Sequence, residues 1–190
     1  MVLSLSACGG SSSDAATPSQ TSVAPSSASA SPTAAPADAP GQFVGMHVNG
    51  VQNGAWPALP FGALRLWDNG TAWSQVETEQ GKYNWFALDT AVSNAEQHGV
   101  KDVLLVLGST PTWAAKKVND TDYPVPGAAS MPKDVAAWDA WVTQVATRYK
   151  GRINSYEIWN EANLKRFWAG TPAQMADLTA RASKIIKSID

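Results

Sequence analysis

The tetrapeptide Trp159-Asn160-Glu161-Ala162 has residue types that could protonate a bound sugar. It ends a segment, 153–159, whose residues alternate as in a β-strand. In parallel β/α barrels, chemistry takes place just past the carboxyl ends of the strands. A glutamate at that place can donate a proton, and the amide before it can hold a hydroxyl. The pattern indicates a catalytic acid, and the neighbouring aromatic residue favours a sugar as its ligand.

The flanks of the tetrapeptide make this interpretation more specific. Tyr156-Glu157-Ile158 precedes it, and Asn163-Leu164 and Phe167-Trp168-Ala169-Gly170-Thr171 follow it. Together they resemble the fourth-strand segment of clan A glycoside hydrolases, most closely family 39. Segments 62–68 (GALRLWD), 81–85 (GKYNW) and 106–114 (VLGSTPTWA) align with that family in the same order, so the resemblance covers residue 43 to the end. Ala162 stands where the family commonly has proline.

The resemblance implies hydrolysis of O-glycosidic bonds with retention of configuration. Glu161 would be the general acid/base, and Asn160 would bind the 2-hydroxyl of the sugar at the cleavage point. In this clan the nucleophilic carboxylate lies on the seventh strand, whereas this chain stops after the fourth strand and its helix. We therefore expect the N-terminal half of a (β/α)8 TIM barrel, inactive by itself.

Glu157 is the nearest other carboxylate on the same strand. Four residues at about 3.3 Å each place it roughly 13 Å from Glu161, too far for a catalytic pair. It faces the barrel interior in phase with Arg65 on the second strand. Arg65 could therefore form a structural pair with Glu157 or, as the resemblance implies, support the missing nucleophile.

Aromatic rings near strand ends are candidate platforms for the flat faces of sugars. By position, the candidates are Trp67, Trp113 and Trp168, with packing as the alternative for each. Trp138 and Trp141 have helical core spacing, and Trp85 is expected in the wall of a loop.

His47, at the end of the first strand, could contact substrate or be a hydrogen-bonded core residue. His98 is interpreted as a cation at the end of a helix. Two separated histidines and one distant cysteine give no metal-ligand spacing, so we predict neither a metal nor a cofactor.

Four strand segments alternate with helical material, which predicts an α/β fold with a parallel sheet. The strands are expected at 43–48, 61–67, 102–107 and 153–159, with Ala63, Arg65, Trp67, Ser155, Glu157 and Trp159 facing inward. One helix runs through Leu88 to Gly99, a second opens near Pro132 and closes at Gly151, and a third begins at the capping box Thr171-Pro172-Ala173-Gln174. Segment 49–60 should hold at most a short helical turn near Trp56.

The first forty residues differ from the rest in composition. Leu5-Ser6-Ala7-Cys8 is typical of a bacterial lipobox, so residues 1–8 are interpreted as a truncated lipoprotein signal and Cys8 as the lipidated residue. Residues 9–40, without aromatic residues, lysine or arginine, are expected to be a disordered linker. Residues 41–190 form the barrel domain. We expect an extracytoplasmic protein in the bacterial cell envelope, lipid-anchored or secreted.

The composition limits the partners. A formal charge of −2 is not basic enough for nucleic acid, and nine tryptophans exceed ordinary usage. We expect a carbohydrate substrate and contact with a membrane only through the lipid anchor. The alternatives are a surface polysaccharide-binding protein without turnover and an inactive fragment of the hydrolase.

Overall fold

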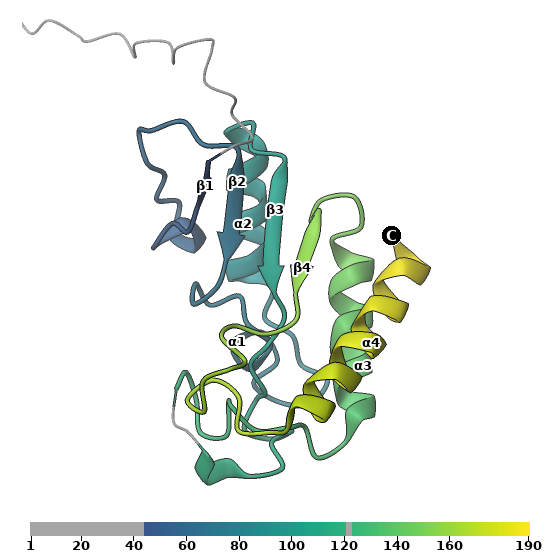
Figure 1. Cartoon of the computed structure of the whole chain (residues 1–190). Coiled ribbons are helices and arrows are strands. Elements are labelled where there is room, and N and C mark those ends of the chain that lie inside the picture. The colour runs from purple at the N-terminus through teal and green to yellow at the C-terminus, as the bar shows by residue number, and fades with distance from the viewer. Residues whose placement is uncertain (1–43, 121–122) are drawn as a thin grey trace, which may run out of the picture. The chain divides into compact units, whose positions relative to one another are not determined.

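The computed structural model describes residues 44–120 and 123–190 (Figure 1). The lipobox, Cys8 and the linker lie outside these residues. Within them, four strands form one parallel sheet in the order β1-β2-β3-β4. The strands are β1 (Gly45–Met46), β2 (Ala63–Leu66), β3 (Asp102–Val106) and β4 (Ser155–Glu157). The predicted alternation of strands and helices is confirmed, although each strand is shorter than expected.

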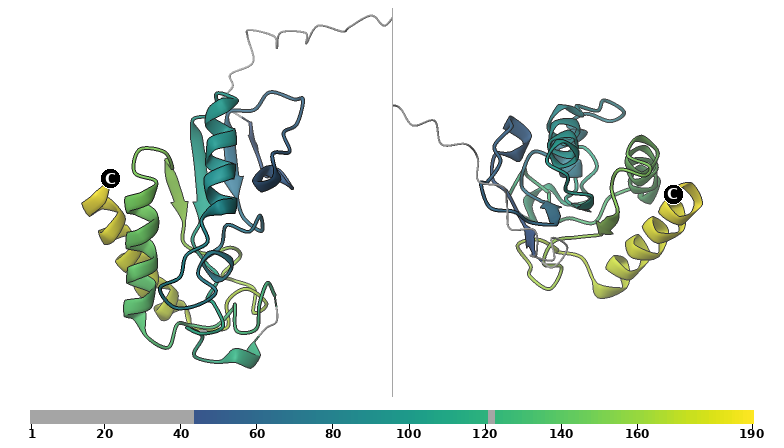
Figure 2. Two further views of the ribbon diagram at one scale, coloured as in Figure 1. Left: turned by 180° about the vertical axis from the view of Figure 1, so that it is seen from behind. Right: turned by 90° about the horizontal axis from the view of Figure 1, so that it is seen from above.

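The two faces of the sheet have different environments. Leu64, Leu66 and Leu105 are fully buried beneath helices, and Figure 2 shows those helices from behind and from above. The alternate positions, Arg65 and Glu157 among them, are half-buried on the opposite face. The strands thus place polar side chains on the inner face, as the alternation predicts.

Three longer helices follow the last three strands. They are α2 (Phe86–Gln97), α3 (Val135–Arg148) and α4 (Pro172–Ile189). Shorter elements are η1 (Val51–Asn53), α1 (Trp73–Val76) and η2 (Val118–Asp120). The capping box of α4 is confirmed: Thr171 Oγ1 accepts from Gln174 N at 3.2 Å, and Gln174 Oε1 accepts from Thr171 N at 2.8 Å.

Two helix predictions need correction. α3 begins at Val135 behind Asp134, whose side chain accepts from Ala136 N, and not near Pro132. Pro132 instead forms an antiparallel bridge with Ala115, a long-range pairing that keeps it extended. The turn expected near Trp56 lies earlier, at η1, and Trp56 stacks on the His98 ring with 4.2 Å between centroids.

Aromatic side chains fill the space between the sheet and the helices. Trp138 and Trp141 are fully buried, which confirms their packing role, and Trp85 stacks on Trp141 with 5.8 Å between ring centroids. α4 packs against α3, since Trp138 Nε1 donates to Leu178 O at 3.2 Å. Aromatic pairs in such geometry add about 0.5–1.5 kcal/mol each beyond the area they bury.

Asp89 joins α2 to the end of α3. Its Oδ2 accepts from Arg148 Nη2 at 2.6 Å, and its Oδ1 accepts from the Tyr149 hydroxyl at 2.7 Å. Burial opposes the charged form, but the hydrogen bonds from Arg148 and Tyr149 outweigh it and lower the pKa of Asp89 below its ordinary value.

We expect Asp89→Asn to lower the free energy of unfolding by about 1 kcal/mol at neutral pH, because the Arg148 and Asp89 side chains remain 41% and 39% exposed. A carboxylate whose folded pKa is lowered stabilises the fold above its unfolded pKa of about 3.9 and loses that contribution as the pH falls through the folded pKa. The deficit should therefore shrink in acid. Urea unfolding at neutral pH and in acid measures this deficit, with Asp102→Asn, at an exposed position, as the control. An undiminished deficit in acid would contradict the prediction.

Candidate active site

The candidate acid lies in the loop that follows β4. Glu161 is exposed, whereas Asn160 before it is only 6% exposed. The loop lies at the carboxyl end of the sheet, where the segments after β2 and β3 also emerge (Figure 1). The structure thus places Asn160 and Glu161 where the sequence predicts them.

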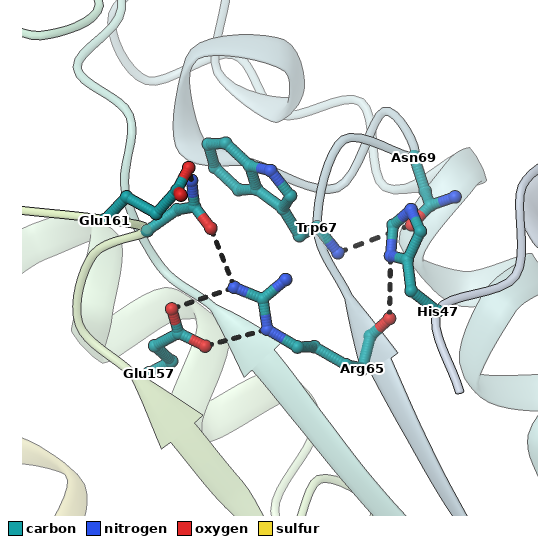
Figure 3. A network of polar contacts seen from close by, with 7 residues as sticks. His47, Arg65, Trp67, Asn69, Glu157 and Glu161 are labelled. Carbon is teal, nitrogen blue, oxygen red and sulfur yellow. Dashed lines mark hydrogen bonds and ion pairs between the residues drawn. The ribbon is translucent and has the colours of Figure 1, made fainter. Parts of the chain in front are cut away.

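Arg65 connects β2 to the residues after β4 (Figure 3). Its Nε and Nη2 donate to the two carboxylate oxygens of Glu157, each at 2.8 Å, and Nη2 also donates to Asn160 Oδ1 at 2.9 Å. Such a two-pronged ion pair fixes both the position and the plane of the guanidinium. The predicted Arg65–Glu157 pair is therefore present, and it reaches the candidate site through Asn160.

The contacts of Asn160 determine the orientation of its amide. Arginine offers only donors, so the group facing Nη2 must be the amide oxygen. The amide nitrogen consequently points the other way and donates to Glu161 Oε2 at 3.1 Å. A chain of hydrogen bonds thus runs from Glu157 through Arg65 and Asn160 to Glu161, and it holds the glutamate beside an oriented amide.

The backbone at Glu161 is unusual. Its φ is 43°, and the one other non-glycine residue with positive φ in the described part of the chain is Asp68, at 62°. Both residues lie just past a strand, Glu161 after β4 and Asp68 after β2. Non-glycine residues whose backbone is held at positive φ are often found at functional sites. Asp68 accepts a hydrogen bond from the Tyr123 hydroxyl.

The three candidate stacking tryptophans differ in exposure. Trp67 is half-buried and meets Phe167 edge-on at 6.1 Å. Trp113 is also half-buried, and its Nε1 donates to Glu77 O at 2.7 Å. Trp168 is only 3% exposed, with Nε1 donating to Thr171 O at 3.2 Å. The structure therefore contradicts a stacking role for Trp168, whose ring packs in the core.

The spacing of Trp159 from Glu157 predicts an inward-facing side chain. In the structure the indole does not face inward. β4 ends at Glu157, so the strand alternation no longer applies at residue 159. The indole is 6% exposed, packs against Trp138 and Trp168, and donates from Nε1 to Phe167 O at 2.6 Å. Trp159 thus anchors the Asn160-Glu161 peptide to the core.

His47 is exposed beside Arg65, which contradicts its interpretation as a core histidine. Its Nδ1 lies 3.2 Å from Arg65 O, and Figure 3 shows it at the edge of the polar network. The position next to Arg65 is compatible with the substrate contact expected for His47.

Two buried polar residues in the segment between β2 and α2 were not predicted. Asn69 is 1% exposed and donates to Val48 O at 3.0 Å. Glu77 is 3% exposed and accepts from Trp73 Nε1 and Gly81 N, both at 2.7 Å. Burial, together with the charge of Glu77, raises the pKa of Tyr83 to about 12. Trp73 and Glu77 are four residues, about one helical turn, apart, and this spacing could have predicted their contact.

Within residues 44–120 and 123–190, no group of three or more His, Cys, Asp or Glu side chains could hold a metal ion. No helix in the same part of the chain is both long and apolar enough to span a bilayer.

The parallel β/α fold and the Asn160-Glu161 site define a clan A glycoside hydrolase. The model of glycosyl hydrolase family 10 matches residues 60–170, more than half of the chain, and the chain belongs to this family. Family 39 is not supported. The motifs that pointed to it surround strand ends shared by the whole clan, so they identify the clan and do not separate its families.

One solved structure shares the fold, and two others show a weaker likeness. A psychrophilic glycoside hydrolase family 10 endo-beta-1,4-xylanase is 18% identical, with a TM-score of 0.52 over 77% of this chain and 48% of its own. Xylanase XynB from Paenibacillus barcinonensis is 18% identical (TM-score 0.46, 68% of this chain and 40% of its own). Xylanase B from Clostridium stercorarium F9 is 16% identical (TM-score 0.46, 68% and 42%). This chain spans less than half the length of each.

Gly108 allows Trp159 to pack as it does. A Cβ at Gly108 would lie 2.5 Å from Cδ2 of the indole, whereas a Cβ at Gly45 would meet nothing closer than 3.5 Å. We expect Gly108→Ala to lower the free energy of unfolding by about 1–3 kcal/mol through overpacking, and Gly45→Ala to change it much less. Urea unfolding of both variants measures the difference, and equal stabilities would show that the indole moves freely.

Proposed function

We propose that this chain carries the general acid/base of a retaining glycoside hydrolase and that Glu161 is that residue. The observation that supports this most directly is the oriented Asn160-Glu161 pair beyond β4 in a family 10 chain. Glu161 protonates the leaving oxygen while a second carboxylate attacks the anomeric carbon. Glu161 then removes a proton from the water that hydrolyses the glycosyl-enzyme intermediate.

The second carboxylate must lie about 5–5.5 Å from the first in a retaining enzyme. Glu157 is unsuited to this role, because the side chains of Arg65 and Asn160 lie between its carboxylate and that of Glu161 in the chain of hydrogen bonds. We infer that the nucleophile comes from outside the described residues. Arg65 can still support it, since Nη1 makes no hydrogen bond to any residue in the described ranges.

The substrate is a polysaccharide or oligosaccharide. Asn160 would bind the 2-hydroxyl, Trp67 and Trp113 would offer ring faces, and His47 would contact the sugar from the first strand. Xylan is the first candidate to test, because the solved structure that shares the fold is an endo-beta-1,4-xylanase.

Proton NMR of the first products tests the proposal. Retention predicts that the anomer released first has the configuration of the substrate, before mutarotation mixes the two forms. Release of the inverted anomer, or of no sugar from any neutral or acidic glycan by the folded full-length protein, would overturn it.

A second candidate function, polysaccharide binding without turnover, is favoured for residues 1–190 assayed alone. Hydrolysis with retention needs a second carboxylate, and Glu157, the nearest other one on the same strand, is already paired with Arg65. We therefore expect binding of glycans without hydrolysis by this segment, and turnover by it would favour a nucleophile within its own sequence.

We also propose that Cys8 is lipidated, which would place the protein outside the cytoplasm, in the bacterial cell envelope. The support is the Leu5-Ser6-Ala7-Cys8 sequence and the Ser-, Ala- and Pro-rich residues after it. Mass spectrometry of the mature protein from its bacterial host should find a diacylglyceryl group on an N-terminal Cys8. A free thiol, or a mature N-terminus elsewhere, would remove the anchor and leave secretion as the remaining alternative.

A further inference from the structure

The loops after β3 and β4 enclose two adjoining hollows beside the candidate acid. One, of about 210 Å³, is lined in part by Lys116, Lys117 and Gly170. The other, of about 390 Å³, is lined in part by Ala162, Lys165 and Gly170. Gly170 belongs to both, and Ala162 directly follows Glu161. We call this path the lysine groove and define it by Lys116, Lys117, Lys165 and Gly170.

The floor of the lysine groove is a fixed backbone segment. A Cβ on Gly170 would lie 2.4 Å from Cζ2 of Trp168 and 3.0 Å from Oε1 of Gln174. Neither neighbour is free to move, because the Trp168 ring is buried in the core and Gln174 closes the capping box of α4. Glycine at this position therefore lets Trp168 and Gln174 pack directly against the backbone that both hollows share.

The lysines are presented from ordered backbone. Lys116 N donates to Met131 O at 3.0 Å, and Lys117 N donates to Ser130 Oγ at 2.9 Å. Their side chains and that of Lys165 are exposed. The ammonium groups can therefore reach a ligand in the groove without any rearrangement of the loops.

Positive charge in the groove has no internal compensation. None of the residues lining either hollow is acidic, and the three lysines form no ion pair with any residue in the described ranges. The two hollows are thus lined by lysines with no carboxylate among their lining residues, in a chain of formal charge −2.

We propose that the lysine groove binds acidic sugars, carboxylated or sulfated, that adjoin the bond to be cleaved. This rests on the proposed function, because it names the class of glycan that Glu161 would act on. Exposed lysines that line two hollows sharing a residue can attract an anionic chain and form charge-assisted hydrogen bonds with its substituents. A neutral glycan would leave this charge unused.

Isothermal titration calorimetry with defined oligosaccharides tests the proposal on the full-length protein. The probes are hexagalacturonate, its fully methyl-esterified form, and a sulfated chondroitin hexasaccharide. In low salt we expect hexagalacturonate, the chondroitin probe or both to bind at least about tenfold more tightly than the ester, and the advantage to shrink in high salt. Tight binding of hexagalacturonate would show that carboxylates alone suffice, and tight binding of the chondroitin probe alone would show that carboxylates do not.

A matched pair of variants locates the binding. The triple variant Lys116→Gln, Lys117→Gln, Lys165→Gln should lose about tenfold or more in affinity for the acidic probe and keep its affinity for the ester. The control Lys101→Gln, Lys150→Gln, Lys187→Gln removes the same charge from exposed lysines elsewhere and should bind like the parent. Circular dichroism shows whether both variants are folded.

Three results would overturn the proposal. They are an affinity for both acidic probes no greater than that for the ester, an equal loss in the control variant, and binding of single-stranded DNA or anionic vesicles in place of both acidic oligosaccharides. Because affinity is measured without turnover, a failure to hydrolyse any glycan would count against the proposed function and not against the groove. Hydrolysis of neutral glycans with no preference for acidic ones would count against the groove and not against the proposed function.

Discussion

Glu161→Ala should slow the hydrolysis of unactivated glycosides by about 10²–10⁴-fold in the active protein, because their leaving oxygens need a proton from a positioned acid. Aryl glycosides with good leaving groups need little protonation, so their first step should slow much less. Their glycosyl-enzyme intermediate should accumulate instead, since the variant has no base to activate water. Steady-state and burst kinetics on both substrate types measure this contrast.

Azide provides the sharper part of this test. A small anion can attack the glycosyl-enzyme intermediate without a general base, so added azide should restore the rate on activated substrates and yield a glycosyl azide. The control is Glu79→Ala, which removes an exposed glutamate from the loop after β2 and should leave all rates unchanged. If Glu161→Ala retained the parent rate and pH profile on unactivated glycosides, Glu161 would be an ordinary loop carboxylate.

Glu157→Ala should lower kcat by about 10²-fold although Glu157 is not proposed to touch substrate, because small displacements of catalytic groups are costly. Without the carboxylate, the guanidinium of Arg65 loses two hydrogen bonds of 2.8 Å and no longer holds the Asn160 amide in one orientation. Glu157→Gln keeps an acceptor and should lose less. Stability should fall by only about 1 kcal/mol, since the paired side chains are 33% and 31% exposed.

A double-mutant cycle separates positioning from general destabilisation. If Glu157 acts through Arg65, then Arg65→Met combined with Glu157→Ala should be little worse in kcat than Arg65→Met alone. Urea unfolding of the same variants gives the stability change for comparison. Additive losses in kcat would contradict the proposed chain of hydrogen bonds, as would a Glu157→Ala variant of unchanged kcat.

Much of this architecture could be predicted from local sequence. The four parallel strands follow from apolar runs between helical segments, and the α4 start follows from Thr171 and Gln174. The Arg65–Glu157 pair follows from two strands with the same inward phase. The strands and the helix start depend on a period or a cap within a few residues, and the pair, although 92 residues apart, depends on the same alternation in two strands.

The features that were missed depend on contacts between distant segments. The start of α3 was placed too early because Pro132 pairs with Ala115. The orientations of Trp159 and Trp168 could not be predicted from strand spacing, because both residues lie past the end of β4. There, packing against α3 and the loop determines where the side chains point. The buried carboxylate of Glu77 is an exception, because its partners Trp73 and Gly81 are each only four residues away.

The packing of Trp159 has a consequence for engineering. The residue that precedes the Asn160-Glu161 pair is held by Trp138 on α3, by Trp168 in its own loop, and by the bare backbone of Gly108. A graft of the Trp-Asn-Glu tripeptide onto another barrel would leave behind the pocket that orients it. Transfer of this acid would therefore require transplanting a sector of the scaffold, whereas the exposed loop residues after Asn163 could be exchanged with less disturbance.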